Sequence, residues 1–548
     1  MMFKARRRLF FSALLLATPL VSQQAKSTYD PGIRPVTAES IAAEEAAENA
    51  WFSHLQFLAS DDLKGRQTGT ADYLRAADYV ESQFKAIGLK SAGTDGFRQP
   101  VGFRKIKTNV EKSSLEIVHP DGSVLSIKIG PGVSLSPHVD GSDPLEAPAV
   151  FAGYGFAVPS QNFDDLDGVD LRGKIAVVFG GSPPSVHGPL RAYFRTAAER
   201  WKALKAAGAI GVITIQPAGS RGVRPSAPTE RPVYLLSDHQ TDTLAGIRLG
   251  ATLAEEAAKV LFEGSPRTLE ELQAIASSGK PFPKFPLAVK IRATTVVQVL
   301  EEFKAPNIVG SLPGTDRHLK SEFLIISAHL DHVGVGREVN GDTIYNGAMD
   351  NAVGIASLIE VAKALAKHPS KRSIIFLALT GEEEGELGSQ YFARFPTVSR
   401  RSIIADLNMD MYLPIFPLHF LEVQGLGEST LGNDARAAAQ LNDIEVQFDK
   451  QPDENRFIRS DQASFVKYGI PGLAFKFGWL PGGPEEKAFN EWIKSRYHRP
   501  SDDLGQPIDR GAAIRFDRVL VTLAERVANA SRRSTWYPES FFSTIPAS

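Results

Sequence analysis

The sequence predicts an α/β fold: a mostly parallel central sheet with helices on both faces, interrupted by a separate β-rich α+β block. Two patterns carry this prediction. After Val299, apolar strands alternate with helices, as they do when a parallel sheet is covered on both faces. Between about Val110 and Pro286 the pattern changes to short β-like segments with one helix among them.

The first 25 residues have the order of a secretory leader. A basic cluster, Lys4 and Arg6 to Arg8, precedes the thirteen-residue apolar run LFFSALLLATPLV. Such a run falls short of the ~20 residues that span a bilayer. We therefore expect export to the periplasm or the medium, without a stable membrane anchor. We place cleavage after Ala25, although no clean A-x-A site marks it.

The composition excludes several functions. Hydrophobic and charged residues make up 43% and 23% of the chain, the proportions of an ordinary globular protein. The formal net charge is -2, and it falls to -6 without the four basic leader residues, which argues against a nucleic-acid binder. There is no cysteine, so disulfides and thiolate ligands are absent, and any metal must be held by His, Asp and Glu.

The first part of the mature chain predicts two helices. The segment from Ala43 to Leu89 has helical periodicity, broken at GRQTGT. In the following block, Asp121 and Gly122 lie in a hairpin signal, and RTAAERWKALKAAGAIG predicts a helix that leads into the strand GVITI. We expect the two helices to join the later α/β sheet, with the block inserted between.

The last part of the chain places polar side chains where predicted strands end. His329 closes the strand EFLIISAHL, the run Glu382 to Glu384 follows SIIFLALTG, and Asp410 closes SIIADLNMD. Asp350 precedes the helix AVGIASLIEVAKALAKH. Ligands of open α/β sheets bind beyond the carboxyl ends of the strands. Clustered carboxylates repel one another, so their convergence favours a bound cation. A mixture of imidazole and carboxylate suits zinc, and also manganese or cobalt, and of these we expect zinc.

Five strings in this order, SAHLDH, GAMDNAVG, TGEEEGELGS, LNMDM and YHRPSDD, resemble the M28 family of zinc metallopeptidases. This resemblance implies a three-layer α/β sandwich of the phosphorylase/hydrolase-like kind. The segments VFAGYGF, DLRGKIAVVFGG and AAGAIGVITI are similar to a protease-associated (PA) domain. We therefore expect a leader over residues 1–25, and the resemblance implies a discontinuous catalytic domain over residues 26–109 and 287–548 and a PA domain over residues 110–286.

The resemblance also implies two zinc ions per chain. Asp350 would bridge both ions, His329 and Asp410 would complete one site, and Glu383 and His498 the other. A cis peptide bond between Asp350 and Asn351 is a further implication. The implied metal ligands are His329, Asp350, Glu383, Asp410 and His498.

Two catalytic residues are implied besides the ligands. Glu382 would be the general base and Asp331 the carboxylate that orients His329. The motif is aligned on Gly385 and on the later Gly388 and Ser389, which assigns the general base to Glu382 and the metal ligand to Glu383. We therefore interpret the third glutamate, Glu384, as solvent-facing. His332 matches no family position and is interpreted as a polar loop residue. Gln462 stands where the family has a histidine in SDH, which puts any substrate contact of that position in doubt.

The function implied is that of an exported dizinc aminopeptidase. It would cleave the N-terminal peptide bond of peptides with a free N-terminus, through a water that bridges the metals and is activated by a glutamate. Two alternatives remain: a glutaminyl-cyclase-like acyltransferase with one zinc, and a non-catalytic receptor-like relative that binds through the PA domain. The preferred first residue, carboxypeptidase action, the oligomeric state and the role of the PA domain stay open.

Overall fold

The computed structural model describes residues 38–141, 143–158, 161–183, 185–186, 188–217, 232–238, 240 and 242–545. The expected leader, residues 1–25, lies outside these ranges. The chain divides into two compact units, Met1–Glu45 and Ala46–Ser548. The first unit is described only where it opens helix α1 (Ala38–Leu58). No helix in the described ranges is long and apolar enough to cross a membrane.

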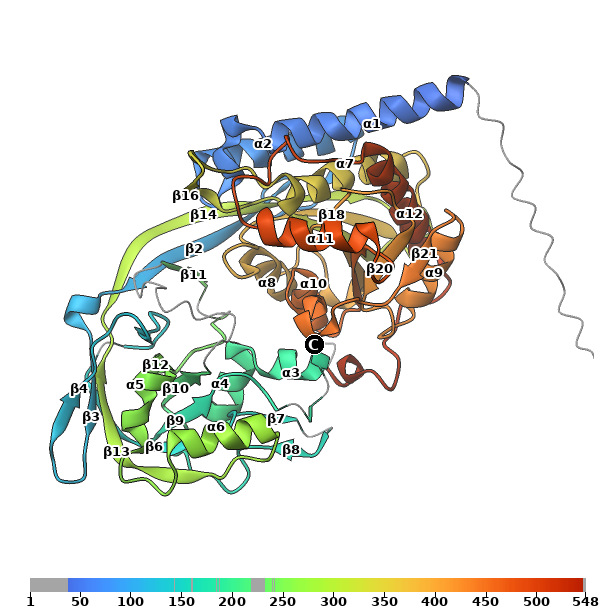
Figure 1. Cartoon of the computed structure of the whole chain (residues 1–548). Coiled ribbons are helices and arrows are strands. Elements are labelled where there is room, and N and C mark those ends of the chain that lie inside the picture. Colours follow the sequence, from blue (N-terminus) through green and yellow to red (C-terminus); the bar gives the residue numbers. More distant parts are fainter. Residues whose placement is uncertain are drawn as a thin grey trace, which may run out of the picture. The chain divides into compact units, whose positions relative to one another are not determined.

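A mixed ten-stranded sheet forms the core of the second unit (Figure 1). Its four central strands are parallel and lie side by side in the order β18 (Ser373–Leu379), β15 (Phe323–His329), β19 (Ile403–Asn408) and β22 (Gly472–Phe477). The predicted α/β class and the parallel centre of the sheet are therefore confirmed.

The flanking strands of this sheet add antiparallel pairs, so the sheet as a whole is mixed. Strand β14 pairs antiparallel with β18, and β20 pairs antiparallel with β22. The flanking strands are β1 (Lys90–Ser91), β2 (Arg98–Thr108), β11 (Val233–Leu236), β14 (Val297–Leu312), β20 (Phe420–Gln424) and β21 (Glu445–Gln447).

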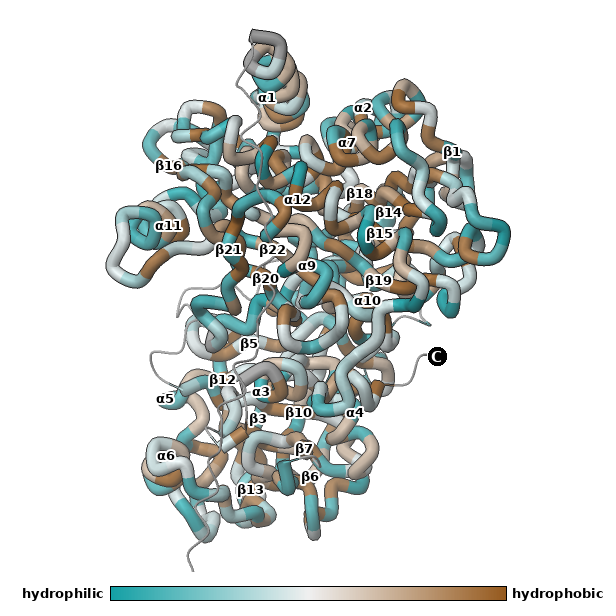
Figure 2. The backbone as a smooth tube through the Cα atoms, turned by 90° about the vertical axis from the view of Figure 1, so that its right-hand side faces the viewer, coloured by the Kyte–Doolittle hydropathy of each residue, from teal (hydrophilic) through white to brown (hydrophobic). Residues whose placement is uncertain are grey.

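Helices cover both faces of the core sheet. Because successive side chains of a strand point to opposite faces, Leu324 and Ile326 belong to one apolar cluster and Ile325 to another. The first cluster includes side chains of α2 (Ala71–Ile87), α7 (Val353–Leu365), α9 (Leu431–Gln440), α11 (Pro484–Ser495) and α12 (Arg510–Asn529), and the second those of α8 (Leu387–Arg394) and α10 (Gln462–Val466). In Figure 2 the central strands around β15 and β18 are the most hydrophobic part of this region.

The inserted block builds a second sheet with its own apolar core. The eight strands, in sheet order, are β4 (Val124–Ser126), β3 (Ser114–Val118), β13 (Phe285–Thr294), β6 (Leu145–Phe151), β9 (Ile175–Phe179), β10 (Gly211–Gln216), β12 (Leu249–Ala254) and β5 (Val133–Leu135). Its helices are α3 (Gly188–Phe194), α4 (Ala197–Ala206), α5 (Glu255–Ala258) and α6 (Leu269–Ser278). The hairpin expected at Asp121 and Gly122 joins β3 to β4.

The block is not confined to the boundaries expected for it. Strand β13 continues to Thr294, past the expected limit at Pro286. Strand β11, in the middle of the block, leaves it and pairs with β2 in the core sheet. A four-residue strand, VYLL, carries no signal in the sequence of which sheet it will join.

The two predicted N-terminal helices, α1 and α2, are present. The side chain of Thr70 caps α2 by accepting a hydrogen bond from the backbone N–H of Tyr73, and Gly88 ends it with a φ of 89°. Between the helices Gly65 has a φ of 72°, and a Cβ there would lie 2.2 Å from the carbonyl oxygen of Tyr345. Only glycine fits this close approach. It brings the neighbouring Arg66 against the loops that contain Leu330 and Gly347.

Candidate metal centre

The parallel strands bring their polar ends together. His329 is the last residue of β15, Asp410 follows β19, and the run from Glu382 to Glu384 follows β18. Asp350 lies in the turn before α7. His498 follows α11 and has a φ of 52°. The five ligands implied by the sequence therefore reach one place from five different segments.

Two groups of three donors meet at Asp350. On one side, Nε2 of His329 lies 3.3 Å from Oδ1 of Asp350 and 3.4 Å from Oδ1 of Asp410. On the other, Nε2 of His498 lies 3.2 Å from Oδ2 of Asp350 and 3.0 Å from Oε2 of Glu383. The two oxygens of Asp350 thus face different groups, as a bridging carboxylate requires.

These distances fit zinc. Ligands about 2.0–2.1 Å from a tetrahedral ion lie about 3.3–3.4 Å from one another. The distances from His329 to its two carboxylate partners match this ligand-to-ligand distance. Those from His498 to its partners are shorter by a few tenths of an ångström. The donor set, imidazole with carboxylate and no thiolate, is one that zinc accepts.

Charge balance points the same way. Burial acts to raise the pKa of the Asp350 carboxyl, but its contacts with His329 and His498 hold that pKa well below the usual range. Burial acts to lower the pKa of His498, but Asp350 and Glu383 raise it to about 10. The two imidazoles thus supply positive charge to the carboxylates, a role that a bound divalent cation would take over.

Solvent reaches the centre from the side of His498. The His498 side chain is 39% exposed, whereas those of His329 and Asp350 are 1% and 4% exposed. Among the donors of the centre, the His498 side chain is thus more open to solvent than those of Asp410, His329 and Asp350.

The loop that carries Asp350 is held by Asp502. One carboxylate oxygen of Asp502 accepts from the backbone N–H of Met349 at 2.9 Å, and the other from that of Asp350 at 3.0 Å. The Asp350–Asn351 peptide bond is cis, which confirms the implication drawn from the resemblance. Asp502 lies in the string YHRPSDD. Nothing in this string predicts that the Asp502 carboxylate accepts hydrogen bonds from backbone N–H groups instead of facing solvent.

Asp331 has a different role from the one expected. Nδ1 of His329 donates to the backbone carbonyl of Asp331 at 3.1 Å, which leaves Nε2 to face the other ligands. The Asp331 carboxylate instead accepts from the backbone N–H groups of Glu382 and Glu383, at 3.2 and 3.3 Å. Asp331 therefore orients His329 through its main chain, and its carboxylate positions the two glutamates.

The three consecutive glutamates differ in surroundings. Burial raises the pKa of the Glu382 carboxyl well above its usual value, and the carboxylates of Asp410 and Glu383 add to the effect. A carboxyl with a raised pKa takes up a proton more readily, which suits a general base. Glu384 is half-buried, contrary to its interpretation as solvent-facing, and burial with the Asp331 carboxylate raises its pKa to about 7.

A family comparison fits this geometry. Residues 307–524, which include all five ligand positions, match the family model described as Peptidase family M28. This part of the chain is therefore similar to peptidase family M28.

Curated relatives of this chain are similar over part of their length. Leucine aminopeptidase 2 of Trichophyton rubrum is 25% identical over 282 residues, which are 47% of this chain and 52% of that protein. The probable lipoprotein aminopeptidase LpqL of Mycobacterium tuberculosis is 29% identical over 252 residues, 41% and 45% of the two chains. The chain thus spans about half the length of these relatives.

A solved structure shares the fold of this chain. The aminopeptidase from Aneurinibacillus sp. strain AM-1 aligns with a TM-score of 0.50 and 19% identity, over 89% of this chain and 95% of that one.

His332 is a residue that the sequence interpretation misses. Its side chain is buried, and its Nδ1 lies 2.6 Å from Oε1 of Glu383. The two atoms are not aligned as a regular hydrogen bond, but within the described chain neither forms a hydrogen bond to any other group. The separation is shorter than the distance between two ligands of one zinc ion, although the donor atoms of His332, Asp350 and Glu383 also lie close enough together to hold a metal ion. A Cβ at position 347 would lie 2.5 Å from the His332 ring. The ring therefore fits only because residue 347 is glycine.

We expect His332→Asn to weaken zinc binding by about 10–100-fold, because Glu383 loses the group that fixes its carboxylate. Zinc retained after dialysis against a graded series of chelator concentrations measures this. His419→Asn, at an exposed imidazole, is the matched control and should bind zinc as the wild type does. Equal retention in both variants would assign His332 no part in holding Glu383.

Gln462 is a structural residue. It is fully buried, its Oε1 accepts from Nδ2 of Asn408 at 2.8 Å, and its Nε2 donates to the carbonyls of Arg456 and Phe457 at 3.1 and 3.0 Å. Because both ends of the amide are bonded within the protein, Gln462 fixes the segment 456–462 to the end of β19.

Proposed function

We propose that this protein is an exported metallo-aminopeptidase that uses two zinc ions per chain to hydrolyse the N-terminal peptide bond of peptides. The observation that carries the proposal is the pair of three-donor groups that share Asp350, each spaced as zinc ligands are. The names of the relatives, leucine aminopeptidase and lipoprotein aminopeptidase, support the reaction class. The leader pattern of residues 1–25 supports export.

The proposed metal ligands form two groups. His329 with Asp410, and Glu383 with His498, would hold the two ions on either side of Asp350. Zinc, when bound, supplies Lewis acidity toward the peptide carbonyl and lowers the pKa of water.

Proton transfer falls to Glu382. Its carboxylate takes a proton from the attacking water and passes it to the amine of the departing peptide. Asp331 keeps Glu382 in place through the backbone N–H groups that its carboxylate binds. We further propose that the inserted block is a PA domain that acts as a lid and contributes no catalytic group.

A free N-terminus should be required for turnover. We expect the zinc-loaded protein to release the first residue from aminoacyl amides and free peptides, and acetylation of the N-terminus to abolish cleavage at that bond. A substrate panel read by mass spectrometry, with varied first residues and matched N-acetyl peptides, measures both. Removal of C-terminal residues from blocked peptides would assign the protein to the carboxypeptidases instead.

Metal analysis separates the alternatives. The proposal requires about two zinc ions per chain, whereas a glutaminyl-cyclase-like acyltransferase would bind one and a receptor-like relative none. The intact His329, Asp350 and Asp410 group favours the two-ion enzyme, because that group has no place in a site for a single ion at Glu383 and His498.

A further inference from the structure

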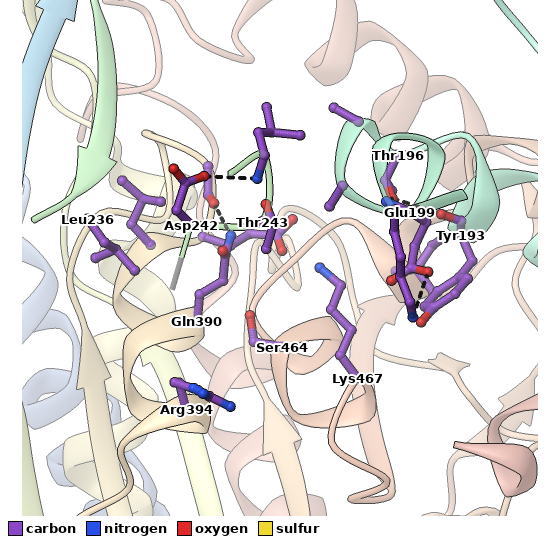
Figure 3. Close-up of a pocket in the computed structure, with 18 of the residues that line it drawn as sticks. Tyr193, Thr196, Glu199, Leu236, Asp242, Thr243, Gln390, Arg394, Ser464 and Lys467 are labelled. Atoms are coloured by element: carbon purple, nitrogen blue, oxygen red, sulfur yellow. Dashed lines mark hydrogen bonds and ion pairs between the residues drawn. The ribbon is translucent and has the colours of Figure 1, made fainter. Parts of the chain in front are cut away.

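A cavity of about 960 Å³ within the second unit adjoins the loop that carries the three consecutive glutamates, Glu382 to Glu384. One wall is formed by the core: Gly385 and Glu386, directly after the three glutamates, then α8, then the segment from Ile458 to Tyr468. The other wall is formed by the start of α4 and the residues from Asp242 to Leu244 of the inserted block (Figure 3). The volume is sufficient for several residues of an extended peptide.

The cavity is lined by more cationic than anionic side chains. The anionic ones are Glu199, Asp242 and Glu386. The cationic ones are Arg104, Lys202, Arg394, Arg459 and Lys467.

Most of these cations already have a carboxylate partner. Arg104 lies 3.1 Å from Glu302, Lys202 lies 3.6 Å from Glu199, and Arg459 lies 3.9 Å from Glu454.

Lys467 and Arg394 differ from the others, since neither forms an ion pair with any described residue. Both are half-buried. In Figure 3 the Lys467 side chain extends from the end of α10 into the cavity, between Ser464 and the wall that carries Glu199. A cationic group in this setting attracts an anionic ligand.

Glu386 connects the cavity to the metal centre. It lines the cavity and lies three residues after Glu383. Burial raises the pKa of its carboxyl; Lys467 and Arg459 act against this, and Asp410 adds to it. Glu386 therefore lies within electrostatic reach of both a proposed zinc ligand and the cations of the cavity.

We propose that this cavity binds the C-terminal carboxylate of short peptides whose first residue lies at the metal centre, with Lys467 and Arg394 as its cationic partners. The inference rests on the proposed aminopeptidase function and adds a substrate class, free oligopeptides. An extended chain advances about 3.3–3.6 Å per residue, so three to five residues cover roughly 10–18 Å. A carboxylate is the one charge that every unmodified short peptide carries at the far end from its N-terminus.

The test compares a tetrapeptide X-Ala-Ala-Ala with its C-terminal amide, where X is the first residue that the enzyme cleaves fastest. We expect wild-type kcat/KM to be about 3–10-fold higher for the free carboxylate, mostly through KM, and the ratio to fall at high salt. Lys467→Met and Arg394→Met should each lower the ratio, and the double variant should bring it near one. Because the amide carries no terminal carboxylate, each substitution should lower kcat/KM for the free peptide more than kcat/KM for the amide.

Lys367→Met, at an exposed lysine near the end of α7, is the control and should keep the wild-type ratio. Equal cleavage of both peptides by the wild type would overturn the proposal while leaving the aminopeptidase function intact. A ratio that persists in the double variant would also overturn it. Failure of the zinc-loaded wild type to cleave either peptide would overturn the function itself, and this inference with it.

Discussion

Glu382→Ala is expected to lower kcat by about 10²–10⁴-fold, the usual contribution of a general base, while the protein keeps about two zinc ions per chain. Glu382 belongs to neither group of donors around Asp350, so its loss removes the proton acceptor and leaves the ligands in place. Its backbone N–H, which binds the Asp331 carboxylate, is unaffected by the substitution. Steady-state kinetics and metal analysis on the same preparation measure the two effects together.

The neighbouring glutamates provide the controls for this experiment. Glu383→Ala removes an oxygen that lies 3.0 Å from His498, so zinc should fall toward one ion per chain and turnover should be lost. Glu384→Gln keeps the shape of a half-buried side chain and should change kcat and zinc content little. If Glu382→Ala loses zinc while Glu383→Ala retains both ions, the two roles are exchanged.

Arg66→Met is expected to lower the free energy of unfolding by about 3–5 kcal/mol. The buried Arg66 guanidinium donates to the carbonyls of Leu330 at 2.9 Å and Gly347 at 3.1 Å, and to those of Leu58 and Asn346 at 2.5 Å each. Methionine fills a similar volume but leaves four carbonyl oxygens without this donor, and each such loss is costly in a buried place.

Electrostatics adds to the expected loss of stability. Burial lowers the pKa of Arg66 to about 10, while the carboxylates of Asp331, Asp502, Asp350 and Glu383 act to raise it. The guanidinium therefore remains charged at neutral pH and offsets the negative charge of the centre. Denaturant unfolding of the metal-free protein measures the effect, with exposed Arg337→Met as a control that should stay within about 0.5 kcal/mol. Equal stability of the two variants would show that Arg66 does not hold these loops together.

The sequence predicts the positions of three of the five proposed metal ligands, His329, Glu383 and Asp410, because each follows an apolar strand that can be recognised in the sequence. Apolar runs such as FLIIS and SIIFLAL are typical of buried strands, and the carboxyl ends of parallel neighbours meet at one edge of a sheet. His329, Asp410 and the three glutamates are therefore placed correctly by strand ends alone. Asp350 and His498 lie outside strands, and their places are implied by the resemblance to a family.

What the sequence does not predict depends on contacts between distant segments. His332 is one residue beyond Asp331, yet its burial depends on Gly347, which the sequence does not place beside it. Asp502 contacts the Asp350 turn across 152 positions of chain. The role of Asp331 differs because a backbone carbonyl, present at every residue, takes the contact expected of its carboxylate.

The pairing of β2 with β14 suggests how a module can be inserted into this fold. Thr108, at the end of β2, is the cross-strand partner of Val297, at the start of β14, and Asn109 donates to the carbonyl of Val296 at 2.8 Å. Everything between these residues thus occupies the place of a hairpin turn, between chain ends only about 5 Å apart. A module of nearly any length can be spliced in at such a point, or exchanged for another, without changing the register of the peptidase sheet. Two features tie this module to its present host: β11 returns to pair with β2, and Tyr193 and Phe194 of α3 pack against Phe541 near the C-terminus.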